Sequence, residues 1–418
     1  MFRMVYADSQ GRLFDHPTLG MVARSGLEYA DPEEAMTPLP EGATLTMVPG
    51  CAPVGVDAQG ELVVMDRLPR QGGRGPAYAV GALLPQGYTR TFLPGYAKQS
   101  ETILPLLGYT AVAFKDGQFW VAAIQTDKPE RWNPTNFNDH NLPDLVKQKL
   151  SNYPDNRILR QLGNCALEYC CLTAQNIFYE RWEGGIPVSP ACNANCLGCI
   201  SKQPAECCPS PQERINFVPT VEEVVQIGLD HLQIAPQGII SFGQGCEGEP
   251  SLSAQVIAQA IGEIRRQTTR GTINMNTNAG YTKGIRQVVD AGINSLRVSL
   301  ISARPSTYNA YYQPDNYKLE DVIASINYAK EYGVYVSLNL LTLPGLTDRP
   351  EEAQAILSLI KQTGIDMIQF RNLNIDTDWF LAQLPATVQE EWGIGVLLAE
   401  IRKQLPQVEI GNFSRPLV

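Results

Sequence analysis

From Gly185 onward, short runs rich in β-branched residues alternate with amphipathic helical patterns, and this alternation constrains the fold more than any other feature. It is typical of βα units repeated over a parallel sheet. The predicted strands are Ile186–Ser189, Ile239–Gly243, Ile273–Asn278, Ser295–Leu300, Val334–Thr342 and Met367–Leu373. The helices predicted between them are Thr220–Ile234, Leu252–Gln267, Thr282–Ala291, Leu319–Tyr332 and Arg349–Gln362. Six units predict an α/β fold, a partial (β/α)6 TIM-like barrel, with reactive groups at the C-terminal ends of its strands.

Other segments flank this barrel, which we place at residues 185–375. Residues 1–140 hold short apolar stretches between many Gly and Pro residues and predict an N-terminal, mostly β domain, with a hairpin over Ala111–Ile124. Residues 141–184 have helical spacing and predict a helical connector. Residues 376–418 are expected to form a C-terminal helical extension, with a last helix near Val388–Gln404.

Charge and hydropathy argue against several classes of protein. The chain has 43 acidic and 33 basic residues, a formal net charge of −10, whereas binding to a nucleic-acid backbone needs a basic footprint. No apolar stretch reaches the roughly 18 residues of a membrane span, and the first residues lack the apolar core of a signal peptide. We therefore expect a cytoplasmic protein with no membrane partner. A nucleic-acid partner is disfavoured but stays open, since a local basic patch could exist. In that compartment, the 10 cysteines are expected to be thiols or metal ligands rather than disulfides.

Three of these cysteines follow the first predicted strand within eight residues, as Cys192, Cys196 and Cys199. Such a loop can wrap around one 4Fe–4S cluster, and three ligands leave one of the four irons open to a chelating cofactor or a substrate. Cys207 and Cys208 follow closely. A fully ligated ferredoxin-like cluster or a four-cysteine zinc site therefore remains open on spacing alone.

The Cys-x3-Cys-x2-Cys loop after the first barrel strand resembles the signature of the radical S-adenosylmethionine (SAM) superfamily, and the resemblance covers about residues 185 to 375. It implies that SAM chelates the open iron through its amino and carboxylate groups. It also implies that electron transfer into the sulfonium releases methionine and a 5′-deoxyadenosyl radical.

The end of the second predicted strand also matches this family in part. The segment Gly245-Cys-Glu-Gly-Glu-Pro250 looks like the Gly-Gly-Glu-Pro motif that holds the amino group of SAM, with Glu247 in place of one glycine. The resemblance therefore implies that Gly248, Glu249 and Pro250 bind the cofactor.

Polar residues on the later strands extend the resemblance. Residues 274–278 are similar to a Thr-Asn-Gly strand of relatives of the molybdenum-cofactor cyclase and of peptide-modifying members, the nearest group in motif style. The implied cofactor-binding residues on the third, fourth and fifth strands are Asn276, Asn278, Arg297, Ser299 and Asn339. A purely structural hydrogen-bonding role is an equally open interpretation of such buried polar residues.

The remaining cysteines and a tyrosine cluster leave alternatives open. Cys246 lies beside Glu249, where it could ligate a cluster, donate a hydrogen atom as a catalytic residue, or only pack. Cysteines at 165, 170 and 171 could help hold a second iron–sulfur cluster, although their helical pattern favours burial as small apolar residues. Tyrosines at 308, 311 and 312 could line a substrate cavity or hold the loop against the barrel.

The leading hypothesis is therefore a radical SAM enzyme acting on an unidentified small-molecule or peptide substrate and served by a reductant such as flavodoxin or ferredoxin. The competing hypotheses are an activator that installs a glycyl radical in a partner enzyme, and a non-enzymatic iron–sulfur electron carrier or zinc-binding scaffold. Because a radical must be shielded from solvent, we expect the N-terminal domain or the chain after Asn374 to cover the strand ends.

Overall fold

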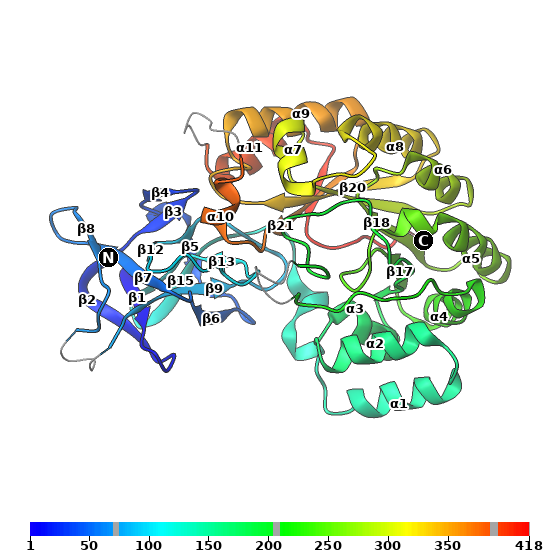
Figure 1. Ribbon diagram of the computed structural model, residues 1–418, viewed down its shortest axis with the longest axis horizontal. Coiled ribbons are helices and arrows are strands. Elements are labelled where there is room, and N and C mark those ends of the chain that lie inside the picture. Colours follow the sequence, from blue (N-terminus) through cyan, green and yellow to red (C-terminus); the bar gives the residue numbers. More distant parts are fainter. Residues whose placement is uncertain (70–74, 204–209, 385–391, 418) are drawn as a thin grey trace.

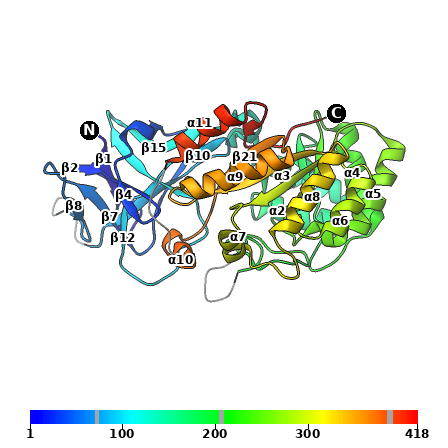
Figure 2. The ribbon, with the colours of Figure 1, turned by 90° about the horizontal axis from the view of Figure 1, so that it is seen from above.

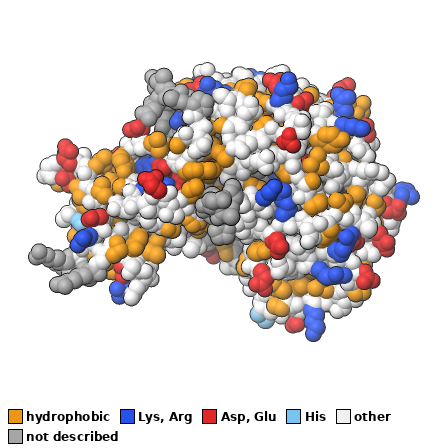
Figure 3. All heavy atoms as spheres, in the orientation of Figure 1, with side chains coloured by type: hydrophobic (Ala, Val, Ile, Leu, Met, Phe, Trp, Pro, Cys, Tyr) orange, Lys and Arg blue, Asp and Glu red, His pale blue; other side chains and the backbone are white. Residues whose placement is uncertain are grey.

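The computed structural model describes residues 1–69, 75–203, 210–384 and 392–417, and its elements form a β-rich region beside a half-barrel of parallel strands (Figure 1). The strands of the β-rich part end at Gln125, and the half-barrel begins at Glu183. Acidic and basic side chains are interspersed over the face seen in Figure 3, rather than gathered in one basic patch.

The N-terminal region is built from antiparallel strands, as the sequence predicted. Its largest sheet follows the order β10-β15-β14-β1-β2-β7-β12, with further strands attached to it, and β11-β3-β4 form a small second sheet. The predicted hairpin is β14 and β15, which turn at Asp116 and Gly117 with φ of 51° and 80°. The strands are β1 (Arg3–Ala7), β2 (Leu13–Met21), β3 (Ala23–Ser25), β4 (Glu28–Ala30), β5 (Met36–Pro38), β6 (Thr44–Met47), β7 (Cys51–Val56), β8 (Leu62–Val64), β9 (Tyr78–Leu83), β10 (Tyr88–Arg90), β11 (Leu93–Pro94), β12 (Tyr96–Lys98), β13 (Tyr109–Thr110), β14 (Val112–Lys115) and β15 (Gln118–Gln125).

Three helices connect this region to the half-barrel: α1 (Leu142–Asn152), α2 (Arg157–Leu167) and α3 (Leu172–Phe178). The sequence predicted helical spacing throughout residues 141–184, but the helix is interrupted between α2 and α3, where Cys170 adopts a φ of 49°. The apolar faces of α2 and α3 join the main hydrophobic core, which they share with the barrel strands.

The half-barrel is a sheet of parallel strands in the order β16-β17-β18-β19-β20-β21-β22, covered on its outer side by helices (Figures 1 and 2). The partial α/β barrel that the alternation predicted is therefore confirmed. Its strands are β16 (Glu183–Gly185), β17 (Ile239–Phe242), β18 (Thr272–Thr277), β19 (Ser295–Leu300), β20 (Tyr335–Thr342), β21 (Met367–Asn372) and β22 (Glu409–Gly411). Its helices are α4 (Val221–Ile234), α5 (Ala254–Gln267), α6 (Thr282–Asp290), α7 (Pro305–Tyr312), α8 (Leu319–Glu331), α9 (Pro350–Thr363), α10 (Thr377–Leu381) and α11 (Ile394–Gln404).

The residues at the start of several helices explain why these helices begin where they do. Thr220 caps α4 by accepting a hydrogen bond from the Glu223 amide at 3.2 Å, and the Glu223 carboxylate accepts one from the Thr220 amide at 2.8 Å. This reciprocal pair satisfies two amides that the first turn of a helix leaves without partners. Pro305 and Pro350 occupy the first position of α7 and α9, where a proline costs no helical hydrogen bond.

Four elements differ from the prediction. The first strand is Glu183–Gly185 rather than Ile186–Ser189, because after Ile186 the amides of the chain bind a carboxylate instead of the neighbouring strand. Helix α7 and strand β22 were not predicted, since both are short. The predicted last helix begins only at Ile394, and residues 388–391 of the prediction lie outside the described residues.

Candidate functional site

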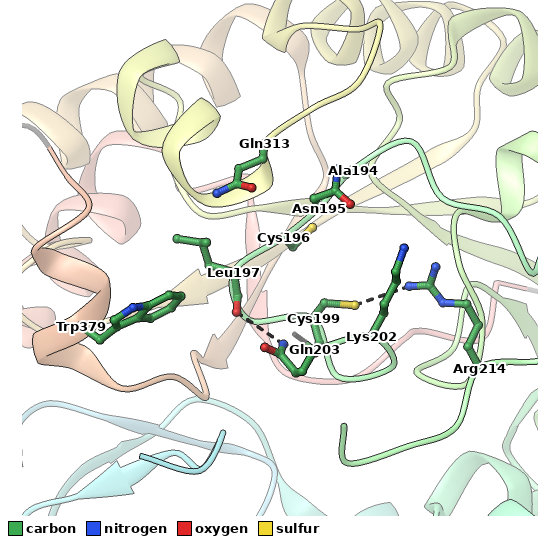
Figure 4. Close-up of a pocket in the computed structure, with 10 residues that line it drawn as sticks. All are labelled: Ala194, Asn195, Cys196, Leu197, Cys199, Lys202, Gln203, Arg214, Gln313 and Trp379. Atoms are coloured by element: carbon green, nitrogen blue, oxygen red, sulfur yellow. Dashed lines mark hydrogen bonds between the residues drawn. The ribbon is translucent and has the colours of Figure 1, made fainter. Parts of the chain in front are cut away.

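The cysteine triad lies in the loop that follows β16, and all three thiols are half-buried. Cys196 and Cys199 line a cavity of about 400 Å³, together with Lys202, Arg214 and Trp379 (Figure 4). Figure 4 shows the Arg214 guanidinium facing the Cys199 sulfur, to which it donates a hydrogen bond of 3.5 Å. Three cysteines in one loop, two of them lining a cavity and one of these against a cation, are residues of the type that holds an iron–sulfur cluster. Within the described residues, no three His, Cys, Asp or Glu side chains are already arranged to hold a metal ion.

The environment of these thiols is apolar enough to disfavour charge when no metal is bound. Burial raises the pKa of the Cys192 thiol, and burial raises the pKa of the Cys196 thiol still further. Cysteine ligands bind iron as thiolates, and a bound cation removes their protons. Uptake of a cluster would therefore release protons from these two residues.

The last turn of α7 holds the triad loop in place. The amides of Asn195 and Leu197 donate to the carbonyl oxygens of Tyr312 and Tyr311, each at 3.0 Å. These carbonyls are among those that a helix leaves free at its C-terminal end. The tyrosine rings themselves are buried, and the backbone of α7 holds the triad loop. Of the two roles considered for these tyrosines, the structure agrees with holding a loop against the barrel rather than lining a substrate cavity.

The loop after β17 packs directly against the triad loop. The Gly248 amide donates to the Ser189 carbonyl at 2.7 Å, and the Glu249 amide donates to the Ala191 carbonyl at 2.8 Å. A Cβ atom on Gly248 would lie 2.0 Å from the Ala191 oxygen, so the approach requires glycine at this position. Two loops that are about 55 residues apart thus meet through their backbones beside Cys192.

Glu247, which replaces a glycine of the family motif, joins the same two loops. Its carboxylate accepts hydrogen bonds from the amides of Val188 and Ser189 at 2.8 and 3.0 Å, and from those of Gly243 and Gln244 at 2.5 and 3.0 Å. Burial raises the pKa of Glu247 to about 7, against the effect of these four donors. The sequence marked this residue only as a departure from the motif, and its role depends on contacts that the motif does not contain.

Glu249 points toward β18 rather than toward solvent. Its carboxylate accepts a hydrogen bond from the Asn278 amide at 2.8 Å and one from the Thr277 hydroxyl. Asn278 in turn donates from its side chain to the Asn193 oxygen at 2.7 Å, within the triad loop. The structure thereby brings together the triad, Gly248, Glu249 and Asn278, while Pro250 begins the short 3-10 turn before α5.

The other residues expected to bind the cofactor lie on the inner face of the sheet. Asn276 donates to the Gly243 carbonyl at 3.2 Å. Arg297 donates to Ser414 at 2.9 Å and lies 3.5 Å from a Glu183 oxygen, so its guanidinium is already held by protein groups. Ser299 and Asn339 are half-buried neighbours in register on β19 and β20. A contact between SAM and these residues stays a prediction.

Cys246 is buried beneath the site rather than exposed in it. It shares a hydrogen bond with Cys165, and this bond and burial together raise the pKa of Cys246 well above the usual range. A neutral, buried thiol paired with another thiol favours the packing interpretation among the three that the sequence left open. Cys170 is exposed and Cys171 is half-buried, whereas Cys207 and Cys208 lie outside the described residues, so a second cluster remains a prediction.

Two residues with clear contacts to the site were not singled out from the sequence. Arg214 lies 15 positions after Cys199, and nothing in the local pattern indicates that it folds back onto that sulfur. Asn193 lies inside the triad itself and contacts Asn278 across 85 positions. The position of the polar residue Asn193 between two cysteines of the triad was a sign that it contributes to the site. Its hydrogen-bond partner, Asn278, could be identified only from the folded chain.

Comparison with known proteins identifies the half-barrel. Residues 186–358 match the family model of the Radical SAM superfamily. No curated protein matches the chain. No helix within the described residues is long and apolar enough to cross a membrane.

Several solved structures match parts of this chain at low similarity. The structure described as native anSMEcpe with bound AdoMet is 16% identical over 46% of this chain and 51% of its own, with a TM-score of 0.36. The FeFe-hydrogenase maturase HydG from Carboxydothermus hydrogenoformans is 15% identical over 64% of this chain and 69% of its own, with a TM-score of 0.37. A radical SAM methyltransferase from Sphaerobacter thermophilus is 14% identical over 54% of this chain and 64% of its own, with a TM-score of 0.38. This chain thus spans about half the length of the first of these structures. Similarities this low transfer neither a substrate nor a residue role to this chain.

Proposed function

We propose that this chain, a radical SAM enzyme through its domain at residues 186–358, holds an open 4Fe–4S cluster on Cys192, Cys196 and Cys199 and acts on a small-molecule or peptide substrate. A 4Fe–4S cluster and SAM are the cofactors of this superfamily. Such a cluster, when bound and reduced, would supply the electron that cleaves SAM into methionine and a 5′-deoxyadenosyl radical. The observation that carries the proposal is the single loop that holds the three cysteines, two of which, Cys196 and Cys199, line a cavity of about 400 Å³.

Several residues of the chain would hold the cluster and SAM in place. The amides of Gly248 and Glu249 fix this segment against the triad loop, where its backbone would hold the ammonium group of SAM. Arg214 adds a positive charge next to Cys199, and hydrogen bonds to cluster sulfurs raise a reduction potential. The electron would come from a protein such as flavodoxin or ferredoxin, which must approach the cavity that Lys202 and Trp379 border.

The test is anaerobic. The protein is reconstituted with iron and sulfide, reduced, and given SAM, and 5′-deoxyadenosine is measured by mass spectrometry. We expect product from the wild type and none from Cys192→Ala/Cys196→Ala/Cys199→Ala. The matched control is Cys51→Ala, because Cys51 is buried in the N-terminal region, away from the triad in the chain.

A second measurement separates the electron-carrier and zinc hypotheses from the proposal. An open cluster should change its electron paramagnetic resonance spectrum when SAM is added, since the cofactor binds iron directly. A cluster with a fourth cysteine ligand should not respond, and Cys207→Ala or Cys208→Ala should then lower its iron content. A reduced cluster whose electron paramagnetic resonance spectrum does not change with SAM, and which yields no 5′-deoxyadenosine, would overturn the proposal.

A further inference from the structure

We propose that a second cavity, on the inner face of the half-barrel, binds the substrate through an oxyanion group, a carboxylate or a phosphate, with Arg371 as its anchor. This inner cavity has a volume of about 380 Å³. The residues that carry the argument are Trp132, Gln212, Gln244, Arg297, Asn339 and Arg371. The assignment of the ligand as substrate rests on the proposed function, whereas the presence of an oxyanion site does not.

The charge of Arg371 is the first observation. Its guanidinium donates to the side-chain oxygens of Gln86 at 2.8 Å, Asn412 at 3.1 Å and Gln369 at 3.4 Å, all of them neutral amides. Within the described residues it forms no ion pair with an Asp or Glu. A charge held away from water is normally paired, because desolvation is otherwise uncompensated. An anionic ligand would supply the missing partner.

The other charges of the inner cavity leave it positive. Its charged lining residues are Arg371, Arg297 and Glu183, which gives a formal charge of +1. The single carboxylate lies 3.5 Å from Arg297 and not against Arg371. Burial, and then the repulsion from Arg297, lower the pKa of Arg371 to about 9, and the more distant carboxylates of Glu183 and Asp127 offset this shift only in part.

Buried polar atoms without partners are the second, independent observation. Gln212 Oε1, Gln244 Nε2, Asn339 Oδ1 and Trp132 Nε1 are inaccessible to solvent and have no hydrogen-bond partner in the described part of the chain. All four residues line the inner cavity. Buried donors and acceptors almost always have hydrogen-bond partners, so four such atoms without partners around one cavity indicate that a polar ligand binds there. The volume falls within the range of small-molecule sites.

The position of the inner cavity relates it to the radical site. Ile200, the residue after Cys199, lines it, as do Gln244 and Gly245 in the loop that leads to Gly248. The cavity beside Cys196 and Cys199 is lined by an entirely different set of residues, which leaves room for a cofactor and a substrate at separate places. Gln86 shows that the N-terminal region also reaches this site, through its contact with Arg371.

The test uses two oxyanions as probes, malonate for carboxylates and inorganic phosphate for phosphates. The thermal unfolding midpoint of the full chain, without added iron, is measured against each probe at an ionic strength held constant with sodium chloride. A ligand at tenfold excess over its Kd should raise the midpoint of the wild type by about 1.5–2 °C. The rise should vanish in Arg371→Gln and persist in Arg266→Gln, whose side chain is largely exposed on α5.

The unliganded variants give a check on folding. Arg371→Gln removes an unpaired buried charge, so its midpoint without probe should equal or exceed that of the wild type. Arg371→Lys keeps the charge but not the planar fork, and should recover part of the response to the probes. A wild type that responds to neither oxyanion, or an Arg371→Gln variant that responds as strongly as the wild type, would overturn the proposal.

The cofactor must be distinguished from the substrate. SAM binding to the reconstituted, unreduced protein is measured by equilibrium dialysis for the wild type and Arg371→Gln. Equal binding supports an anchor for the substrate, whereas loss of SAM binding would assign the guanidinium to the cofactor carboxylate and overturn the proposal. Because the probe titrations need no cluster and no radical, failure of the proposed radical chemistry would leave their result unaffected.

Discussion

Gly248 occupies the point of closest contact between the two loops that meet at the triad. Its amide binds the Ser189 carbonyl, and the position where a side chain would begin is filled by the Ala191 oxygen. Both neighbours are backbone atoms, which cannot rotate away as a side chain can. A residue of any other type therefore has to separate the loops.

Gly248→Ala should consequently destabilise the protein and disturb the triad. We expect a loss of roughly 1–3 kcal/mol in the free energy of unfolding, the usual cost of overpacking, together with less iron bound per chain after reconstitution. Urea unfolding and iron analysis measure the two effects.

The control is Gly262→Ala in the middle of α5, where an added Cβ meets no atom within 4 Å. This variant should be more stable than the wild type by roughly 0.5–1 kcal/mol, because alanine is the better helix former. Equal stability of the two variants would show that the Gly248 contact is not tight.

At the scale of elements, α4 is tied to the start of the sheet by a buried histidine in its last turn. The His231 Nε2 atom lies 2.8 Å from the Trp182 carbonyl oxygen, directly before β16, and 1% of the residue is exposed. Burial lowers the pKa of His231 to about 4. The neutral ring donates from Nε2, and a second proton on Nδ1 would find no partner in the described part of the chain.

This pKa predicts an acid-dependent loss of stability. The unfolded chain takes up a proton on His231 near pH 6.5, whereas the folded chain resists until about pH 4. Stability from this group is therefore complete above pH 6.5 and falls as the pH drops to about 4, by on the order of 3 kcal/mol. Urea unfolding across this range should show a steeper decline in the wild type than in His231→Gln. Parallel curves would contradict the assignment.

At the scale of the whole molecule, the N-terminal region docks onto the C-terminal ends of β20 and β21. The Asn372 side chain accepts from the Arg90 amide at 2.9 Å and donates to the Tyr88 carbonyl at 3.0 Å. Lys98 pairs with the buried Asp376 at 2.5 Å, and the Gly26 amide binds the Pro344 carbonyl. This placement agrees with the expectation that the region covers the strand ends.

Asn372→Ala should loosen this docking without unfolding either part. Two hydrogen bonds between the regions are lost and the Arg90 amide is left without its acceptor, which should cost about 1–3 kcal/mol. Hydrogen exchange should become faster in β10 and at the end of β21 while the rest of the half-barrel stays protected. Asn164→Ala, at an exposed position on α2, is the matched control and should leave the exchange of β10 unchanged.

The sequence by itself determined the features that depend on short-range order. Alternation of β-branched and amphipathic segments predicted β17 to β21 and their helices almost to the residue, because side-chain periodicity reports burial within a few residues. The triad was equally local, since its three cysteines share one loop. The first strand was misplaced because Ile186 and Val188 are buried as strand residues are, yet the Val188 amide binds the Glu247 carboxylate instead of the neighbouring strand.

Only the tertiary structure decided which polar groups become hydrogen-bond or ion-pair partners. The partners of Arg214, Glu247 and Asn278 lie from a few to 85 positions away, and those of Arg371 reach back to Gln86 across 285 positions. A pattern shows that a polar residue is buried, but not whether a carboxylate, an amide or nothing faces it. That is why the sequence could indicate the cluster, whereas the unpaired guanidinium of the inner cavity emerged only once the chain had folded around it.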